Sequence, residues 1–175
     1  METAIVSIIC IALLVVGGMT MSENFLSSVD SSTVGLEQIS DRGEEIMRTE
    51  LATISATMTA ADTLEVALRN RGQTKLTSFS KWDVIVQYYD SGGSYYVKWL
   101  PYTDNATPGD NEWTKKGIYL DAGSETAEVF EPGILNPGEE IVIRAKLNPA
   151  VGVDTTNLVV TSTPNGIPAS ISFSR

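Results

Sequence analysis

The first 22 residues limit what this chain can fold into more than any other feature. No charged residue lies between Thr3 and Ser22, and the segment from Ala4 to Met21 contains eleven isoleucine, leucine, valine or methionine residues. A helix of about 20 such residues is roughly 30 Å long, enough to cross a bilayer. Burying these side chains is favourable by more than roughly 15 kcal/mol in gross terms. Such a helix has to be covered, either by lipid or by further copies of itself.

The flanks of this segment differ from those of a signal peptide or a stable membrane anchor. Both normally carry lysine or arginine beside the apolar run, whereas the first basic residue here is Arg42. Either a basic leader was removed just before Met1, or Met1 is the initiator and the orienting signal is weak. We favour removal, because the positive-inside bias is strong in membrane anchors. A processed N-terminus that begins abruptly with apolar residues is typical of a polymer subunit held briefly in the membrane.

Composition narrows the classes of function. The net charge of −10 disfavours nucleic acid and acidic membrane surfaces as partners. Cys10 is the only cysteine, so no intrachain disulfide can form, and histidine, the commonest general base, does not occur. No Gly-rich phosphate loop, Ser/His/Asp set or Cys-x-x-Cys motif is present. We therefore expect neither an enzyme nor a cofactor.

The helical pattern continues beyond the apolar segment, but on one face only. Apolar residues recur at sums of three and four as far as Met58, with charged residues between them. This predicts a helical region over 1–60, fully apolar over 1–22 and amphipathic over 23–58. The residues expected to form a buried assembly core are Ile5, Ile8, Ile9, Ile11, Leu13, Leu14, Val16, Phe25, Val29, Leu36 and Ile39.

From residue 61 the hydrophobic period changes to two, which is typical of strands with one buried face. The clearest runs are 64–68, 82–88, 141–147 and 167–173, separated by turn sequences such as Asp90–Ser94 and Asn136-Pro-Gly138. Asn165-Gly166, between two alternating runs, is the clearest hairpin signal. Seven or eight short strands over 61–175 predict an antiparallel, immunoglobulin-like β-sandwich. The expected fold class is α+β, a long N-terminal helix followed by this sandwich.

Signals for ligand binding or modification are weak. Asp104, Asp110 and Glu112 lie in one oxygen-rich loop, but without the ligand spacing of an EF-hand, so a solvated acidic loop is the simpler interpretation. Asn105 begins an N-glycosylation sequon in the same loop. The pairs Tyr88-Tyr89 and Tyr95-Tyr96 flank a predicted hairpin, so each pair shows one ring to each face. The outward rings could contact a sugar or a neighbouring subunit, although cross-strand stabilisation is the simpler interpretation.

The combination of an apolar helix, an amphipathic continuation and a β-domain resembles the type IV filament superfamily. Within it the chain is most similar to the archaellins, the archaeal-type flagellins, and the resemblance covers its whole length. The β-domain segments that carry it are 68–72 (Leu-Arg-Asn-Arg-Gly), 82–86 (Trp-Asp-Val-Ile-Val) and 135–139 (Leu-Asn-Pro-Gly-Glu). Bacterial type IV pilins are less similar, since they usually begin with Phe and carry Glu at position five, where this chain has Met1 and Ile5. Met1 also departs from the typical first residue of a mature archaellin.

The resemblance implies an extracellular helical filament that rotates for swimming. Similar subunits are inserted in the cytoplasmic membrane, cleaved by a prepilin-type peptidase and extracted by an ATPase-driven platform. Their apolar helices form the filament core, and their β-domains form the outer wall. Two alternatives remain: a membrane-tethered β-sandwich, such as a stator or accessory protein of the same machine, and an adhesive pilin. An apolar stripe beyond the bilayer favours a filament over a tether, because a tether needs no such stripe.

Overall fold

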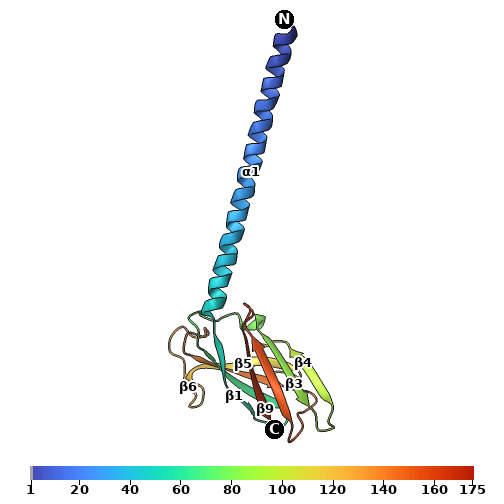
Figure 1. Cartoon of the computed structure of the whole chain (residues 1–175). Helices are drawn as coiled ribbons and strands as arrows, with labels where there is room; N and C mark the ends of the chain where they lie inside the picture. Colours follow the sequence, from blue (N-terminus) through green and yellow to red (C-terminus); the bar gives the residue numbers. More distant parts are fainter. Residues whose placement is uncertain (1) are drawn as a thin grey trace. The chain divides into compact units, whose positions relative to one another are not determined.

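The computed structural model describes residues 2–175, so Met1, whose status as mature terminus or initiator stays open, lies outside the described residues. One helix, α1 (Glu2–Arg48), precedes a β-domain, which confirms the α+β fold class (Figure 1). The remaining elements are β1 (Leu51–Met58), β2 (Thr63–Asn70), a 3₁₀ turn η1 (Phe79–Lys81), β3 (Asp83–Tyr89), β4 (Tyr95–Leu100), β5 (Glu112–Asp121), β6 (Thr126–Ala127), β7 (Glu140–Lys146), β8 (Thr156–Ser162) and β9 (Pro168–Ser174).

The helix is shorter than the sequence predicts. It ends at Arg48, and residues 51–58, expected to be the end of the amphipathic helix, form strand β1. β1 pairs antiparallel with β2, and Leu51, 7% exposed, joins the hydrophobic core. The apolar residues of 51–58 fit a helical spacing, but pairing with β2 overrides this local preference. The chain separates into two compact units, one ending at Glu44 and the other spanning Glu45–Arg175, so β1 belongs to the β-domain.

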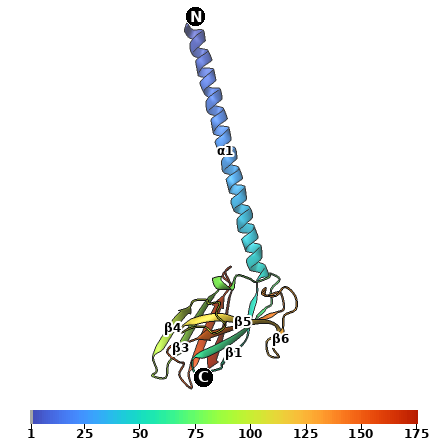
Figure 2. The same cartoon turned by 180° about the vertical axis from the view of Figure 1, so that it is seen from behind.

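The β-domain consists of two antiparallel sheets. One has the strand order β1-β2-β7-β5-β6 and the other the order β4-β3-β8-β9. β1 and β9 lie side by side and bring the sheets together at one edge, where the Thr53 hydroxyl donates a 3.5 Å hydrogen bond to the Ser170 carbonyl (Figure 1). Figure 2 shows the β-domain from behind, with strands of both sheets labelled. Eight of the nine strands in the described residues lie within 61–175, in agreement with the seven or eight expected there, and the ninth is β1.

The hydrophobic core lies between the two sheets. The alternation read from the sequence is confirmed, since Leu64, Val66 and Leu68 of β2 and Ile141 and Ile143 of β7 are buried. Strands β3, β8 and β9 bury their own alternate residues against this layer: Val84, Val86, Tyr88, Val159, Ala169 and Phe173. Trp113 is fully buried in this core, and its ring centroid lies 4.9 Å from that of Tyr102. Because these residues come from both sheets, the sandwich contains a complete core of its own.

Two predicted hairpins are present. β8 and β9 pair across the Pro164-Asn165-Gly166 turn, in which Gly166 has a φ of +84°, a conformation that glycine adopts without steric cost. β3 and β4 pair so that Tyr88 faces Tyr96 and Tyr89 faces Tyr95. Tyr88 is fully buried while Tyr89 and Tyr95 are exposed, so each tyrosine pair does show one ring to each side. The burial of Tyr88, with Tyr96 and Asp90 nearby, raises its pKa to about 12.

The end of α1 is fixed to the β-domain by several polar contacts. The amide of Gln73 donates a 2.7 Å hydrogen bond to the carbonyl of Arg48, and the side-chain amide of Asn165 donates one of 2.9 Å to the hydroxyl of Thr49. Thr49 in turn donates to the Glu45 carbonyl. A Cβ atom at Gly72 would approach the Arg48 carbonyl oxygen to 2.5 Å, so only glycine fits there. The local sequence pattern does not predict this junction, because Gln73 and Asn165 lie far along the chain from Arg48 and Thr49.

Candidate assembly surface

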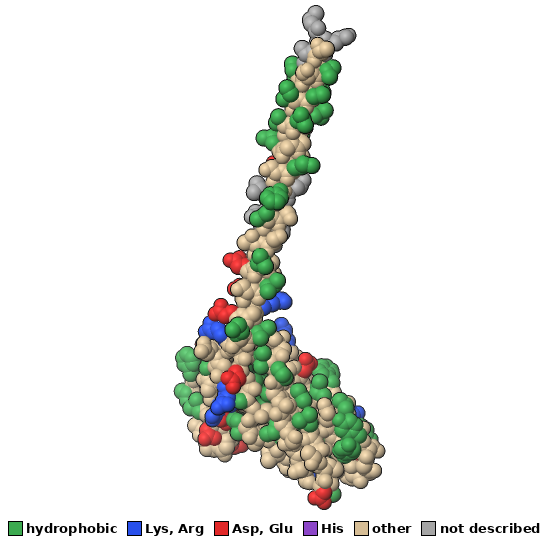
Figure 3. All heavy atoms as spheres, in the orientation of Figure 1, with side chains coloured by type: hydrophobic (Ala, Val, Ile, Leu, Met, Phe, Trp, Pro, Cys, Tyr) green, Lys and Arg blue, Asp and Glu red, His purple; other side chains and the backbone are tan. Residues whose placement is uncertain are grey.

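Most of the large hydrophobic side chains that are exposed in the described residues lie on the helix α1. The segment Ile5–Glu23, with a mean hydropathy of 2.4, is long and apolar enough to cross a membrane, and none of it is buried within the chain. Figure 3 shows hydrophobic side chains along the helix. The eleven residues expected to form an assembly core each leave between 44 and 75% of their surface exposed. Exposed apolar surface on this scale marks a site that contacts lipid or protein.

The hydroxyl side chains within α1 are satisfied by the helix itself. Ser7 donates to the carbonyl of Thr3 at 2.9 Å, and Thr20 to the carbonyl of Gly17 at 3.0 Å. Farther along, Ser32 and Thr33 donate to the carbonyls four residues earlier. A polar group that is hydrogen-bonded internally costs little to remove from water. These hydroxyls therefore do not oppose burial of the helix in lipid or among other helices.

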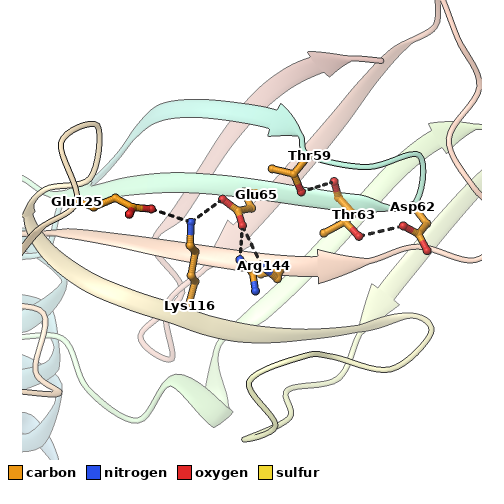
Figure 4. Close-up of polar contacts among 7 residues, drawn as sticks. All are labelled: Thr59, Asp62, Thr63, Glu65, Lys116, Glu125 and Arg144. Atoms are coloured by element: carbon orange, nitrogen blue, oxygen red, sulfur yellow. Dashed lines mark hydrogen bonds and ion pairs between the residues drawn. The ribbon is translucent and has the colours of Figure 1, made fainter.

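The outer face of the five-stranded sheet carries a network of charged side chains. Glu65 of β2 accepts hydrogen bonds from Arg144 of β7, at 2.9 and 2.7 Å, and from Lys116 of β5 at 3.1 Å (Figure 4). Lys116 also donates to Glu125 at 3.1 Å. Burial tends to raise the pKa of Glu65, but the hydrogen bonds and charges of Arg144 and Lys116 outweigh it and lower that pKa. The network therefore ties three strands together.

Figure 4 also shows a second, smaller group of contacts at the turn between β1 and β2, where Thr59 donates to the carbonyl of Thr63 and Thr63 donates to Asp62. Beside the Glu65 network lies a hollow of about 280 Å³, lined in part by Ile54, Ala67 and Val142. This network was not predicted from the sequence, although charged residues at the outward positions of β2, β5 and β7 were a signal for it.

Asp104, Asp110 and Glu112, the weak candidates for metal ligands, each interact with a different partner. Asp110 forms an ion pair of 2.7 Å with Lys146 and accepts a 2.9 Å hydrogen bond from Asn148, and these contacts lower its pKa. Glu112 accepts a hydrogen bond from the amide of Gly109. Burial, together with the hydrogen bond and charge of Asp104, raises the pKa of Tyr102. In the described part of the chain no three acidic or cysteine side chains are grouped as metal ligands. Asn105, the possible glycosylation site, is exposed in this loop.

The outer face of the second sheet carries exposed aromatic side chains. Tyr89, Tyr95 and Trp99 are between 41 and 58% exposed. Side chains of the neighbouring strand β3 hold two of them, since the Tyr95 hydroxyl donates to Gln87 and the Trp99 indole donates to Asp83, both at 2.9 Å. The Tyr89 and Tyr95 rings lie 5.0 Å apart, which is the cross-strand contact expected from the sequence.

Comparison with known proteins gives relatives by structure alone. No protein-family model matches the chain, and no curated protein matches it by sequence. The archaeal flagellum of Methanospirillum hungatei strain JF1 is similar over 96% of this chain and 90% of that chain, with 12% identity and a TM-score of 0.60.

Two further structures match over a smaller part of the chain. Archaeal flagellin FlaB1 from Methanocaldococcus jannaschii covers 72% of this chain and 89% of its own, with 14% identity and a TM-score of 0.52. The archaellum periplasmic stator protein FlaG from Sulfolobus acidocaldarius covers 71% of this chain and 99% of its own, with 22% identity and a TM-score of 0.50. The chain thus has an archaellin-like fold, an N-terminal helix joined to a β-sandwich.

Proposed function

We propose that this chain is a structural subunit that polymerises into an extracellular, archaellum-type filament, with α1 in the filament core and the β-domain outside. The observation that carries this proposal is the exposed apolar helix, combined with similarity to a flagellar filament protein over 96% of the chain. The stator and flagellin neighbours support the coarser conclusion that the chain acts in an archaellum-type machine. Its filament-forming surface would be the eleven exposed helix residues from Ile5 to Ile39 named above.

The physical chemistry of the helix fits such a role. Transfer of an apolar helix from lipid to a bundle of similar helices exchanges one apolar environment for another, so it costs little. A subunit could therefore wait in the membrane and be extracted into a growing filament. We propose that membrane insertion comes first, followed by cleavage by a prepilin-type peptidase and extraction by an ATPase-driven platform. Each subunit would then contact different patches of the copies above and below it, as helical polymers require.

A second candidate function is a membrane-tethered stator. FlaG, the stator protein, is matched over 99% of its own length, and its identity to this chain, 22%, exceeds that of either flagellin structure. A tether would use Ile5–Glu23 as a permanent membrane anchor and keep its β-domain in the cell envelope. The two functions differ in what surrounds the apolar helix: sister helices in a filament, lipid in a tether.

Shearing of filaments from the cell surface distinguishes the two. If the chain is a filament subunit, negative-stain microscopy of the sheared material shows filaments, and mass spectrometry identifies this chain as their major protein. The substitution Ile11→Asp then abolishes the filaments, while the matched substitution Ile11→Leu preserves them. Recovery of the wild-type chain only as a detergent-extracted membrane protein would refute the filament and favour the stator.

A further inference from the structure

We infer that α1 beyond its apolar segment pairs with the same segment of a second copy, as a parallel two-stranded coiled coil formed while both chains are in the membrane. This inference rests on the membrane insertion proposed above, because insertion of two copies in one direction makes their helices parallel. The contact would run along one line of the helix, called here the seam: Phe25, Val29, Ser32, Leu36, Ile39, Gly43 and Ile46.

The spacing of the seam is that of a coiled coil. Its residues alternate between steps of four and three, the heptad pattern that keeps one line of a helix facing a single partner. Five of the seven are apolar, and each of these five leaves between 43 and 69% of its surface exposed. Such a line of a and d positions is narrower than the apolar face of a helix packed on a globular core.

The charges of the same segment are arranged so that identical copies can meet. Between Glu23 and Arg48 there are six acidic residues and two arginines. Acidic residues occupy positions 23, 30, 37 and 44, one in every heptad. Each residue of an α-helix is turned by about 100° around the helix axis, so this acidic row lies roughly 130° around the helix from the centre of the seam. Among the positions that flank the seam, Ser28, Thr33, Gly35 and Ser40 are uncharged, and Arg42 carries the one charge, which is positive. Two identical acidic helices therefore avoid direct like-charge contact.

Two glycines give an independent reason to expect a close partner. A Cβ atom added at Gly35 or Gly43 would meet nothing within 4 Å in the chain itself, so its own fold requires neither glycine. Each glycine costs about 1 kcal/mol relative to alanine in a helix interior. Gly43 lies in the seam and Gly35 beside it. Small residues at these positions allow two helix backbones to approach closely, as they do in membrane helix pairs.

Disulfide crosslinking of the full-length chain tests this arrangement. In a Cys10→Ser background, cysteine is introduced at Val29 or Leu36, both in the seam, or at Val34. Val34 is a matched control, because it is also an exposed valine, 53% against 44% for Val29, but lies on the opposite face. Each variant is produced in a host without other filament proteins, and its membranes are mildly oxidised. Co-expression of two forms with tags of different size shows whether a crosslinked species contains two copies of this chain.

The seam predicts crosslinked homodimers at 29 and 36 that exceed those at 34 by at least about tenfold, because a disulfide requires Cα atoms within about 7 Å. Equal crosslinking at all three positions, none at the seam, or a chain absent from the membrane would overturn the inference. So would adducts of a mass that fits a different protein. The filament proposal is tested separately, by the shearing experiment. Filaments without a seam-specific homodimer would refute the coiled coil but not the filament. A seam-specific homodimer without filaments would refute the filament but not the coiled coil.

Discussion

Replacement of Glu65 by alanine tests whether the charged network on the outer sheet face stabilises the β-domain. Glu65 accepts three hydrogen bonds from two cations, and its side chain is only 15% exposed. Exposed ion pairs contribute about 0–1 kcal/mol, whereas removal of one partner from a buried pair costs about 3–5 kcal/mol. Because Arg144 and Lys116 are 29 and 26% exposed, they regain part of their hydration. We expect a loss of about 2 kcal/mol in the free energy of unfolding.

The same network predicts a dependence of stability on pH. The pKa of Glu65 is lower in the folded protein than its ordinary value, so the folded state binds this proton less readily than the unfolded state. The stabilisation is therefore complete above the ordinary pKa of glutamate, about 4.3, and is lost as the pH falls through the lower folded value. The Glu65→Gln variant lacks this titration, so its stability should fall less than that of the wild type below about pH 4.

Urea unfolding of residues 45–175, followed by tryptophan fluorescence, measures both effects. Asp110→Asn is the control, because the ion pair of Asp110 with Lys146 is exposed to solvent and its loss should cost less than that of Glu65. A double-mutant cycle of Glu65→Ala with Arg144→Met isolates the coupling between the two side chains. Equal stability of wild type and Glu65→Ala, or a coupling free energy near zero, would refute the reasoning.

Three further predictions concern other parts of the chain. Ile11→Asp should prevent assembly without unfolding the β-domain, since a charge at the centre of a membrane helix costs about 2.5–3.5 kcal/mol; normal sheared filaments would contradict this. A fragment of residues 45–175 should be soluble and monomeric by analytical ultracentrifugation, whereas 61–175 should unfold at lower urea or aggregate, because it lacks β1 and the buried Leu51; equal stability would show that β1 contributes nothing. If the exposed Asn105 carries a glycan, Asn105→Gln should lower the mass of the chain purified from its natural source by the glycan mass, and an unchanged mass would rule out modification there.

The sequence predicts the sheets of this protein better than the boundary between its helix and its strands. Period-two alternation identifies the buried residues of β2, β3 and β7, because one face of each strand is covered by the other sheet. The Asn165-Gly166 hairpin follows from turn chemistry that acts within a few residues. These signals are local, so they can be read without knowledge of the rest of the fold.

The end of α1 depends on contacts that are distant in sequence. Residues 51–58 become a strand because β2 pairs with them and β9 lies beside them, more than 100 residues later. The Glu65 network likewise joins side chains from β2, β5 and β7 that are 51 and 79 residues apart. Of the predicted sites, the helix surface remains the candidate for assembly, while Asp104, Asp110 and Glu112 have separate partners that a sequence alone does not reveal.

The junction between α1 and β1 bears on how force would pass through the molecule. Only Thr49 and Glu50 separate the two elements, and Asn165 and Gln73 hold this junction by hydrogen bonds. A flexible linker would stretch before it transmitted tension. Here only two residues intervene, so a pull on the last turn of the helix, residues 45–48, would be passed directly to β1. Insertion of a few Gly-Ser residues after Thr49 would therefore create a flexible linker that no longer transmits tension from the helix to the β-domain.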